Sequence, residues 1–194
     1  LAGMLDSQIA RLALASHGLA ASDVDARLVE AAALMGEAYA AAVSVGSRVH
    51  HLLPGTVALA ERLRDAGFAL GVLTGNVRAV ARAKLAAAGI DTLLPIGAYG
   101  DTAQERAHLV EMALLDAERH YATVFPLERT VLIGDTPRDI EAARAGGVRV
   151  VAVATGRSTV EQLAACSPDA VFPDLASTQA VLATIQELVQ PTRN

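Results

Sequence analysis

Apolar and polar positions divide the chain into two parts with different periodicities. From residue 6 to about residue 47, apolar residues recur at helical spacing and no strand-like run interrupts them, which predicts an all-helical part. After Leu53-Pro54-Gly55, short apolar runs alternate with amphipathic helical stretches. Strands that alternate with helices form right-handed βαβ units, so the second part is predicted to hold a parallel sheet.

The second part is predicted to be an α/β unit. The expected strands cover residues 68–73, 93–96, 130–133, 148–154 and 170–172, and the expected helices cover residues 61–66, 76–88, 102–120, 137–145, 159–165 and 175–189. The strands are apolar at almost every position, so we expect helices on both faces of the sheet. The predicted fold is therefore a Rossmann-like parallel sheet in residues 53–194, preceded by a small all-α part in residues 1–52.

Composition narrows the classes of protein to which the chain can belong. Its hydrophobic content of 53% excludes a disordered chain, and no apolar run is long enough to predict a membrane span. The single cysteine, Cys166, cannot form an internal disulfide, which favours a reducing cytoplasm. The net charge of −5, without a basic stripe, argues against nucleic acid as a partner. The Ala-rich helical part is compatible with a homo-oligomer.

The strongest candidate chemistry follows the strand expected at residues 130–133. There the sequence reads Gly134-Asp135-Thr136-Pro137-Arg138-Asp139, and ligands of open parallel sheets bind beyond the carboxyl ends of the strands. Asp135 and Asp139 are hard oxygen ligands of the kind that Mg²⁺ takes. The alternative for Asp139 is helix capping, with Thr136 as N-cap and Pro137 as the first helical residue. That alternative is weaker for Asp135, because Thr136 already supplies the cap.

A second candidate is the turn Thr74-Gly75-Asn76, which follows the strand expected at residues 68–73. A hydroxyl, free backbone N–H groups and the positive end of a helix together form a cradle for a phosphate group. In this interpretation Asn76 is the N-cap of the next helix. Ordinary helix capping without a ligand is the alternative for the whole turn.

A transferring phosphoryl group needs a cation to balance its charge. Arg106 lies after the strand expected at residues 93–96, near the start of a helix, and can point over the same sheet edge. Lys84 is the competing candidate. It lies in the middle of a helix, where a solvated surface lysine is the alternative interpretation.

In this order, these residues resemble the motifs of the haloacid dehalogenase (HAD) superfamily of phosphohydrolases. Thr74 resembles the second motif of that family, Arg106 the third, and Asp135 with Asp139 the fourth. The surrounding sequence is most similar to the phosphoglycolate-phosphatase-like branch with an α-helical cap, and the resemblance covers essentially the whole chain. It implies a HAD-like core in residues 53–194 and a helical cap in residues 1–52. The most specific of these motifs is Gly-Asp-Thr-Pro-x-Asp.

The first motif of the family, Asp-x-Asp-Gly-Thr on the first strand, has no counterpart in this sequence. Asp6 follows no apolar strand, and we expect it to be the N-cap of the first helix. The family's first strand lies between strands that match residues 69–73 and 130–133. Without it, buried backbone groups of both strands would be unpaired, at about 1–3 kcal/mol each. We therefore expect an upstream segment of roughly 30–50 residues, the size of a strand and the entry to the cap.

The resemblance implies a Mg²⁺-dependent hydrolase of a small phosphorylated metabolite, which acts through an aspartyl-phosphate on an upstream Asp. Thr74, Gly75 and Asn76 would bind the phosphoryl group, and Arg106, or alternatively Lys84, would neutralise it. Asp135 would bind Mg²⁺ with Asp139 in support. Without the upstream segment, the chain would be inactive by this mechanism. The alternative function is a non-catalytic or truncated relative that serves as a binding or regulatory subunit.

Overall fold

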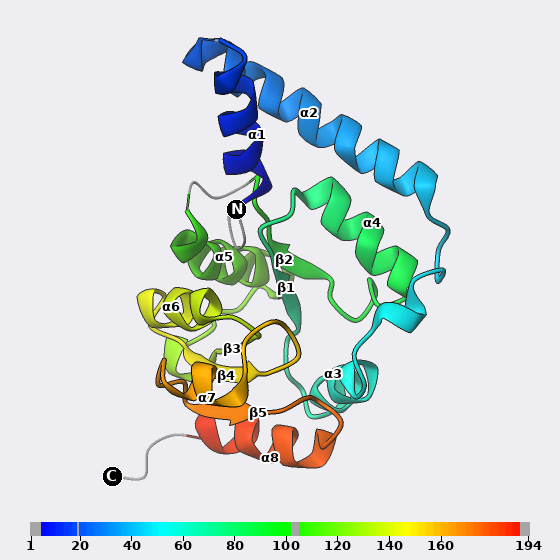
Figure 1. Cartoon of the computed structure of the whole chain (residues 1–194). Coiled ribbons are helices and arrows are strands. Elements are labelled where there is room, and N and C mark those ends of the chain that lie inside the picture. Colours follow the sequence, from blue (N-terminus) through cyan, green and yellow to red (C-terminus); the bar gives the residue numbers. More distant parts are fainter. Residues whose placement is uncertain (1–4, 19, 102–104, 191–194) are drawn as a thin grey trace. The chain divides into compact units, whose positions relative to one another are not determined.

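The described residues form helices and no strand up to His51, and helices alternate with strands from Thr56 onward. The computed structural model describes residues 5–18, 20–101 and 105–190. No helix within these residues is long and apolar enough to cross a membrane. The helices are α1 (Asp6–Ser16), α2 (Ala21–Ala42), α3 (Thr56–Asp65), α4 (Arg78–Ala88), α5 (Leu109–Tyr121), α6 (Pro137–Ala145), α7 (Val160–Ala164) and α8 (Thr178–Leu188) (Figure 1). The strands are β1 (Gly71–Leu73), β2 (Ile96–Ala98), β3 (Val131–Gly134), β4 (Arg149–Val153) and β5 (Ala170–Phe172), and the 3-10 helices are η1 (Val49–His51), η2 (Arg106–His108) and η3 (Leu127–Arg129).

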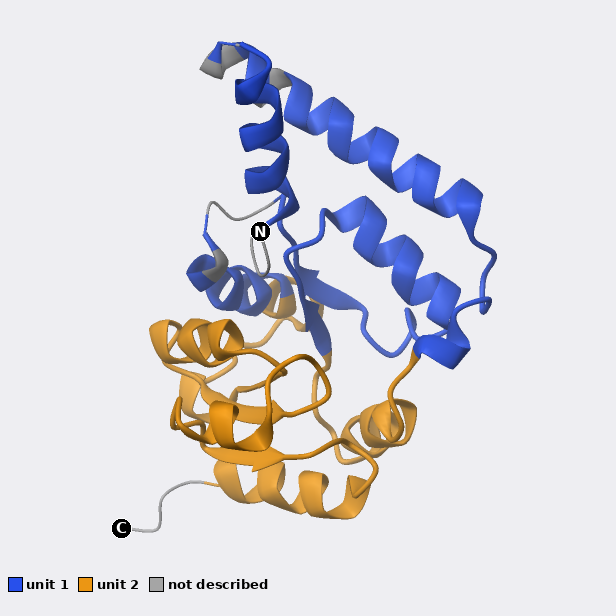
Figure 2. Cartoon of the chain, in the orientation of Figure 1, with its two compact units in different colours: residues 1–51, 71–116 blue, residues 52–70, 117–194 orange. Residues whose placement is uncertain are grey.

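The structure divides into two compact units (Figure 2). Unit 1 contains residues 1–51 and 71–116, and unit 2 contains residues 52–70 and 117–194. The chain therefore leaves unit 1, returns to it, and ends in unit 2. The sequence predicts a different division, into a cap of residues 1–52 and a core of residues 53–194. The cap and core stay a prediction.

Unit 1 combines α1, α2 and α4 with a parallel pair of strands. β1 pairs with β2 in the register that places Gly71 opposite Ile96. α2 packs along α4, and the two helices approach closely at Gly36 (Figure 1). A Cβ atom added to Gly36 would lie 2.2 Å from the Cβ of Ala79, so only glycine fits there. A small apolar cluster, made by Leu5, Ala98 and Leu109, fixes the start of α1 against β2 and α5.

Unit 2 contains a three-stranded parallel sheet with β4 in the middle. Val151 and Val153 of β4 are buried with residues of α3 and α8 on one face of this sheet. Side chains alternate along a strand, so Val150 and Ala152 point to the opposite face. α6 packs on β3 and β4 there. Helices therefore cover both faces, and the predicted α/β, Rossmann-like fold class is confirmed.

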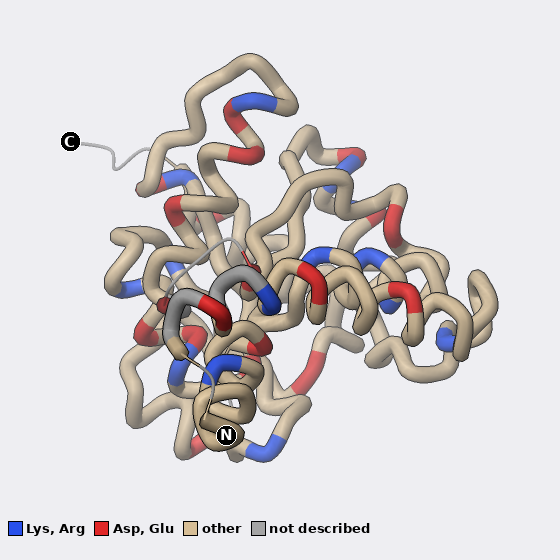
Figure 3. Tube along the Cα trace, turned by 90° about the horizontal axis from the view of Figure 1, so that it is seen from above, with Lys and Arg blue, Asp and Glu red and all other residues tan. Residues whose placement is uncertain are grey.

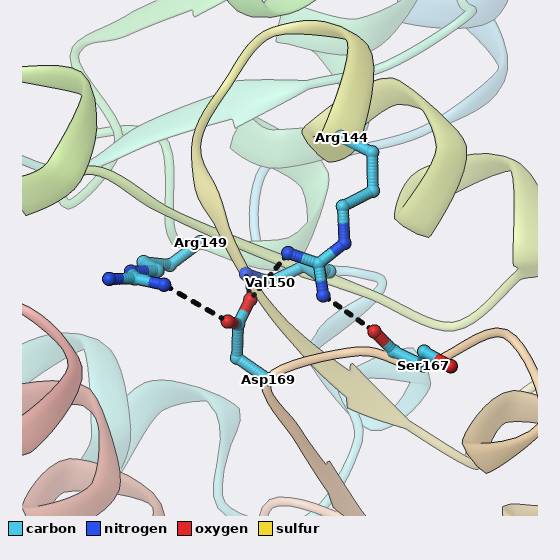
Figure 4. A network of polar contacts seen from close by, with 5 residues as sticks. All are labelled: Arg144, Arg149, Val150, Ser167 and Asp169. Atoms are coloured by element: carbon cyan, nitrogen blue, oxygen red, sulfur yellow. Dashed lines mark hydrogen bonds and ion pairs between the residues drawn. The ribbon is translucent and has the colours of Figure 1, made fainter.

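One carboxylate connects the starts of β4 and β5 (Figure 4). Asp169 Oδ2 accepts hydrogen bonds from the Val150 N–H at 2.8 Å and from Arg144 Nη1 at 3.2 Å. Its Oδ1 accepts from Arg149 Nη1 at 3.4 Å, and Arg144 Nη2 donates to the carbonyl oxygen of Ser167. The Asp169 side chain is only 12% exposed, so this network replaces water at the buried end of the strands.

The described residues form two separate sheets, β1-β2 in unit 1 and β3-β4-β5 in unit 2, where the sequence predicts one. Within these residues, β1 and β3 each have a strand partner on one edge only. β2 is buried at every position and β4 at all but its first, whereas β1 and β3 are half-buried or exposed, with Ile133 37% exposed. These two are the strands that the sequence analysis places beside the family's first strand.

Several predicted element boundaries differ from the structure, among them the start of α3, which is predicted at residue 61 and lies at Thr56. Two others have a clear local context. The second strand is predicted at residues 93–96, but β2 begins at Ile96, directly after Pro95. Proline has no N–H to donate to a strand ladder, so pairing starts after it. The helix predicted to start at Thr102 is found as α5, which begins at Leu109 after η2, while residues 102–104 lie outside the described part.

Acidic and basic residues are interspersed along the traces of both units (Figure 3). No long run of one sign marks a site by charge alone in the described residues. The candidate residues must therefore be judged by their individual contacts.

Candidate functional site

The first group of candidate residues lies in the 74–77 loop, which connects β1 to α4 in unit 1. The Thr74 N–H donates to the carbonyl oxygen of Ala98 at 3.0 Å, which continues the β1–β2 pairing by one residue. The Asn76 N–H donates to Thr74 Oγ1 at 3.2 Å. A hydroxyl that accepts a hydrogen bond still carries its own hydrogen, so Thr74 Oγ1 can donate to a ligand oxygen.

Gly100 allows this loop to lie directly against the end of β2. The Gly100 N–H donates to the carbonyl oxygen of Asn76 at 2.8 Å. A Cβ atom at Gly100 would lie 2.0 Å from the carbonyl oxygen of Gly75, a distance that no side chain tolerates. The position of Gly75 in the candidate cradle therefore depends on a glycine that the sequence analysis did not single out.

Asn76 does not cap α4, and that prediction is wrong. The helix begins at Arg78 and its N-cap is Val77, which has no side-chain oxygen to accept a hydrogen bond. The Val77 N–H donates to Asp6 Oδ2 at 3.1 Å, and the Arg78 N–H donates to Asp101 Oδ1 at 3.1 Å. Two carboxylates from distant segments therefore occupy N–H groups at the helix end that the sequence analysis expected to be free.

Asp6 also differs from its prediction as an N-cap. The N-cap of α1 is Leu5, and Asp6 is the first helical residue. Its carboxylate accepts hydrogen bonds from Asn76 Nδ2 as well as from the Val77 N–H. No signal in the local sequence reveals this role, because the partners lie about 70 positions along the chain.

The two candidate cations are both in unit 1. Lys84 is exposed, and its Nζ donates to Asn76 Oδ1 at 2.7 Å and lies 5.7 Å from the ring centroid of Tyr39. Arg106 opens η2, and its side chain lies outside the described part of the structure. The structure thus brings Lys84 to the 74–77 loop, and the choice between Lys84 and Arg106 stays a prediction.

The second group of candidate residues lies in the 134–139 turn of unit 2, between β3 and α6. Asp139 is buried, and its Oδ2 accepts hydrogen bonds from the Asp135 N–H at 3.2 Å, the Thr136 N–H at 3.0 Å and Thr136 Oγ1 at 2.8 Å. The Asp139 N–H donates in return to Thr136 Oγ1, which completes a capping box. The capping interpretation of Asp139 is therefore present in the structure, and the same bonds fix the backbone of Asp135.

Two glycines leave room for these carboxylates. A Cβ atom at Gly134 would lie 2.3 Å from the Cβ of Asp139, and one at Gly156 would lie 2.1 Å from Asp135 Oδ2. Gly156 follows β4, so the carboxylate of Asp135 lies against the segment that leaves the neighbouring strand. The local sequence gives no sign of this contact, because Gly156 and Asp135 follow different strands.

The donor chemistry of this turn fits a magnesium ion. Mg²⁺ is held by oxygen ligands, commonly one or two carboxylates with water and substrate phosphate. Asp135 offers a half-buried carboxylate at the carboxyl end of a strand. The described residues contain no group of three or more His, Cys, Asp or Glu side chains that could hold a metal ion. Water and substrate would therefore have to complete such a site.

Comparison with known proteins tests the predicted family resemblance. A family model described as HAD-hydrolase-like matches residues 105–178, which include Arg106, Asp135 and Asp139. The phosphoglycolate phosphatase of Rhodospirillum rubrum is 36% identical over 126 residues, which are 64% of this chain and 50% of that protein. These matches support the predicted resemblance to the HAD superfamily. The phosphoglycolate phosphatase of Synechococcus elongatus is 30% identical over 119 residues, 61% of this chain and 53% of that protein.

The fold also matches a solved structure. The crystal structure of CbbY from Rhodobacter sphaeroides, in complex with phosphate, aligns with a TM-score of 0.58 and 21% identity over 81% of this chain and 65% of that chain. The predicted resemblance to the superfamily is thus confirmed. The chain spans about half the length of the curated relatives it matches, 50% and 53%. The roles of individual residues stay predictions.

Proposed function

We propose that the protein is a HAD-type phosphatase that hydrolyses a small phosphomonoester with Mg²⁺. The observation that carries this proposal is the 134–139 turn, in which Asp139 binds the backbone N–H of Asp135. The Asp135 carboxylate itself accepts no hydrogen bond from the part of the chain that the structure describes. A carboxylate presented in this way at the carboxyl end of a strand is suited to a cation.

The residues of both units have distinct roles in this proposal. Thr74 donates its hydroxyl hydrogen to a non-bridging phosphoryl oxygen, and the backbone of Gly75 and Asn76 shapes the loop around it. Arg106, or alternatively Lys84, balances the charge of the phosphoryl group. Asp135 binds Mg²⁺, and Asp139 holds Asp135 in place. When bound, Mg²⁺ neutralises charge on the phosphoryl oxygens.

The nucleophile in this proposal is an Asp upstream of Leu1. Its carboxylate oxygen forms a bond to phosphorus while the bond to the leaving oxygen breaks, and a second upstream Asp gives that oxygen a proton. The second carboxylate then takes a proton from water, whose oxygen attacks phosphorus, and inorganic phosphate leaves with the first carboxylate restored. Within the described residues, β1 and β3 each pair on one edge only, and an unpaired strand edge can accept a further strand.

The test is an assay of the full-length protein, upstream residues included, against a panel of small phosphomonoesters. Phosphoglycolate is the first substrate to assay, because the two relatives described above are named phosphoglycolate phosphatases. We expect hydrolysis that stops on addition of EDTA and returns with Mg²⁺. Asp135→Asn is expected to lower kcat/KM by roughly 10²-fold or more.

Asp65→Asn is the matched control for this assay. It removes a carboxylate of the same unit that is exposed and bonded to Arg64, and we expect unchanged kinetics. If the folded full-length protein hydrolyses no phosphomonoester in the presence of Mg²⁺, the proposal is wrong. A non-catalytic binding or regulatory subunit would then be the better description.

A further inference from the structure

Asp6 contacts the 74–77 loop through both its backbone and its side chain. Its N–H donates to the carbonyl oxygen of Gly75 at 2.8 Å. Its carboxylate accepts from Asn76 Nδ2 at 3.2 and 3.4 Å and from the Val77 N–H at 3.1 Å. One residue of α1 therefore contacts three consecutive residues of the loop.

Asn76 is held from both ends of its amide group. Its Nδ2 donates to the Asp6 carboxylate, and its Oδ1 accepts from Lys84 Nζ at 2.7 Å. Rotating the amide by half a turn would place NH₂ against an ammonium group and the oxygen against a carboxylate. The negative charge of Asp6 and the positive charge of Lys84 thus select one orientation of Asn76.

The fixed loop in turn determines where the Thr74 hydroxyl lies. The Asn76 N–H donates to Thr74 Oγ1, so the hydroxyl oxygen is placed by the same residue that Asp6 and Lys84 hold. A donor that is held in position before the ligand arrives loses less conformational entropy on binding. We propose that Asp6 is a positioning residue for the 74–77 loop, which it orders for phosphoryl binding through Asn76 and Val77.

This inference rests on the proposed function of Thr74, and it predicts the sign of a charge effect. Asp6 also brings a negative charge near a loop that receives a phosphate dianion. If repulsion outweighed ordering, removing the carboxylate would strengthen phosphate binding. Ordering through Asn76 predicts the opposite, namely that Asp6→Ala weakens binding.

The experiment measures binding of inorganic phosphate to the full-length protein by calorimetry in buffer with Mg²⁺. We expect Asp6→Ala to raise the Kd for phosphate about tenfold and Asp6→Asn to raise it less, because an amide oxygen can still accept from Val77. Asn76→Ala is expected to raise the Kd for phosphate by a similar factor. Because Asp6 acts through Asn76, the double variant of Asp6→Ala and Asn76→Ala should raise the Kd no further than the more affected single variant does.

Two control variants separate positioning from general loss of structure. Asp101→Ala removes the other carboxylate at the same end of α4, where it binds only the Arg78 N–H of that helix. Ser7→Ala removes the hydroxyl that bonds the carbonyl oxygen of Gly100, one residue away from Asp6. Both should change the phosphate Kd by less than twofold, even where they lower the melting temperature as much as Asp6→Ala does.

Amide hydrogen exchange gives a second readout that does not depend on phosphate. Asp6→Ala should increase exchange at Asn76 and Val77, whereas Asp101→Ala should increase it at Arg78 alone. Unchanged exchange at Asn76 and Val77, or unchanged or tighter phosphate binding by Asp6→Ala, would overturn the positioning role. Thr74→Val distinguishes the two proposals. Phosphate binding that is insensitive to Thr74 contradicts the proposed function and the inference that rests on it. Binding that depends on Thr74 but not on Asp6 contradicts the inference alone.

Discussion

The two segments that carry the candidate residues are stabilised in different ways. The 134–139 turn in unit 2 is closed by its own residues, since the Asp139 carboxylate accepts from the N–H and hydroxyl of Thr136 and from the Asp135 N–H, and the Asp139 N–H donates to Thr136 Oγ1. The 74–77 loop in unit 1 is closed by Asp6, Ala98 and Gly100, which lie far from it in the sequence. The first can form together with its own helix, whereas the second forms only after distant segments fold against it.

The largest effect is expected from disturbing the distant contacts of the 74–77 loop. In Gly100→Ala, the new Cβ would overlap the carbonyl oxygen of Gly75, and backbone on both sides must move. We expect a loss of about 3 kcal/mol or more in the free energy of unfolding, measured by urea denaturation. Gly67→Ala is the control, because Gly67 has a positive φ of 85° but open space around it. That variant should lose only about 1 kcal/mol.

A smaller effect is expected at Asp169, whose contacts span about 20 residues within unit 2. Asp169→Ala leaves the N–H of the fully buried Val150 without its side-chain acceptor, which should lower the free energy of unfolding by about 1–3 kcal/mol. Asp169→Asn keeps an oxygen for Val150 and loses only the exposed ion pairs with Arg144 and Arg149. Equal losses in both variants would show that the arginines, and not the strand N–H, carry the effect.

The locally closed 134–139 turn should be the more tolerant of the two. Thr136→Val removes the hydroxyl that accepts from the Asp139 N–H and donates to its carboxylate. We expect a loss of about 1 kcal/mol, the usual contribution of an N-cap side chain, by thermal denaturation. Thr123→Val, at an exposed position outside any helix or strand, should change nothing. A loss in Thr136→Val as large as that in Gly100→Ala would contradict the comparison.

The smallest effect concerns a second local cap, at the start of α7. The pKa of Glu161 lies below its ordinary value of 4.5. The largest cause is a hydrogen bond from the Thr159 side chain, and a hydrogen bond from the backbone N–H of Glu161 is the second. A lowered pKa in the folded state contributes stability above the ordinary pKa, and this contribution is lost as the pH falls through the folded-state pKa. Thr159→Val should raise the pKa of Glu161, measured by an NMR titration of its carboxyl carbon, and an unchanged pKa would contradict this cause.

The sequence predicts local features of the fold well. α6 begins at Pro137 and ends at Ala145 as predicted, because Thr136, Pro137 and the glycines after the helix are signals that lie next to its ends. β5 also has the predicted bounds. The start of α4 was predicted wrongly, because the N–H groups there bind Asp6 and Asp101, whose proximity depends on how the chain folds.

The same distinction applies to the candidate site. The short spacing between Asp135 and Asp139 brings them together in one turn, and the sequence shows this directly. Gly100 and Gly156 could not be found in this way, because each contacts a candidate residue from a different strand end. Their importance comes from the absence of a side chain at a close approach, which the sequence alone does not reveal.

The order in which the two units are built has a consequence for synthesis on the ribosome. The chain crosses between the units three times, so unit 1 is complete only once Asp116 has emerged. Leu59 and Leu63 of α3 pack with α8, near the end of unit 2. The apolar face of α3 therefore stays exposed to water until α8 has been synthesised, and we expect chaperones to bind the nascent chain there.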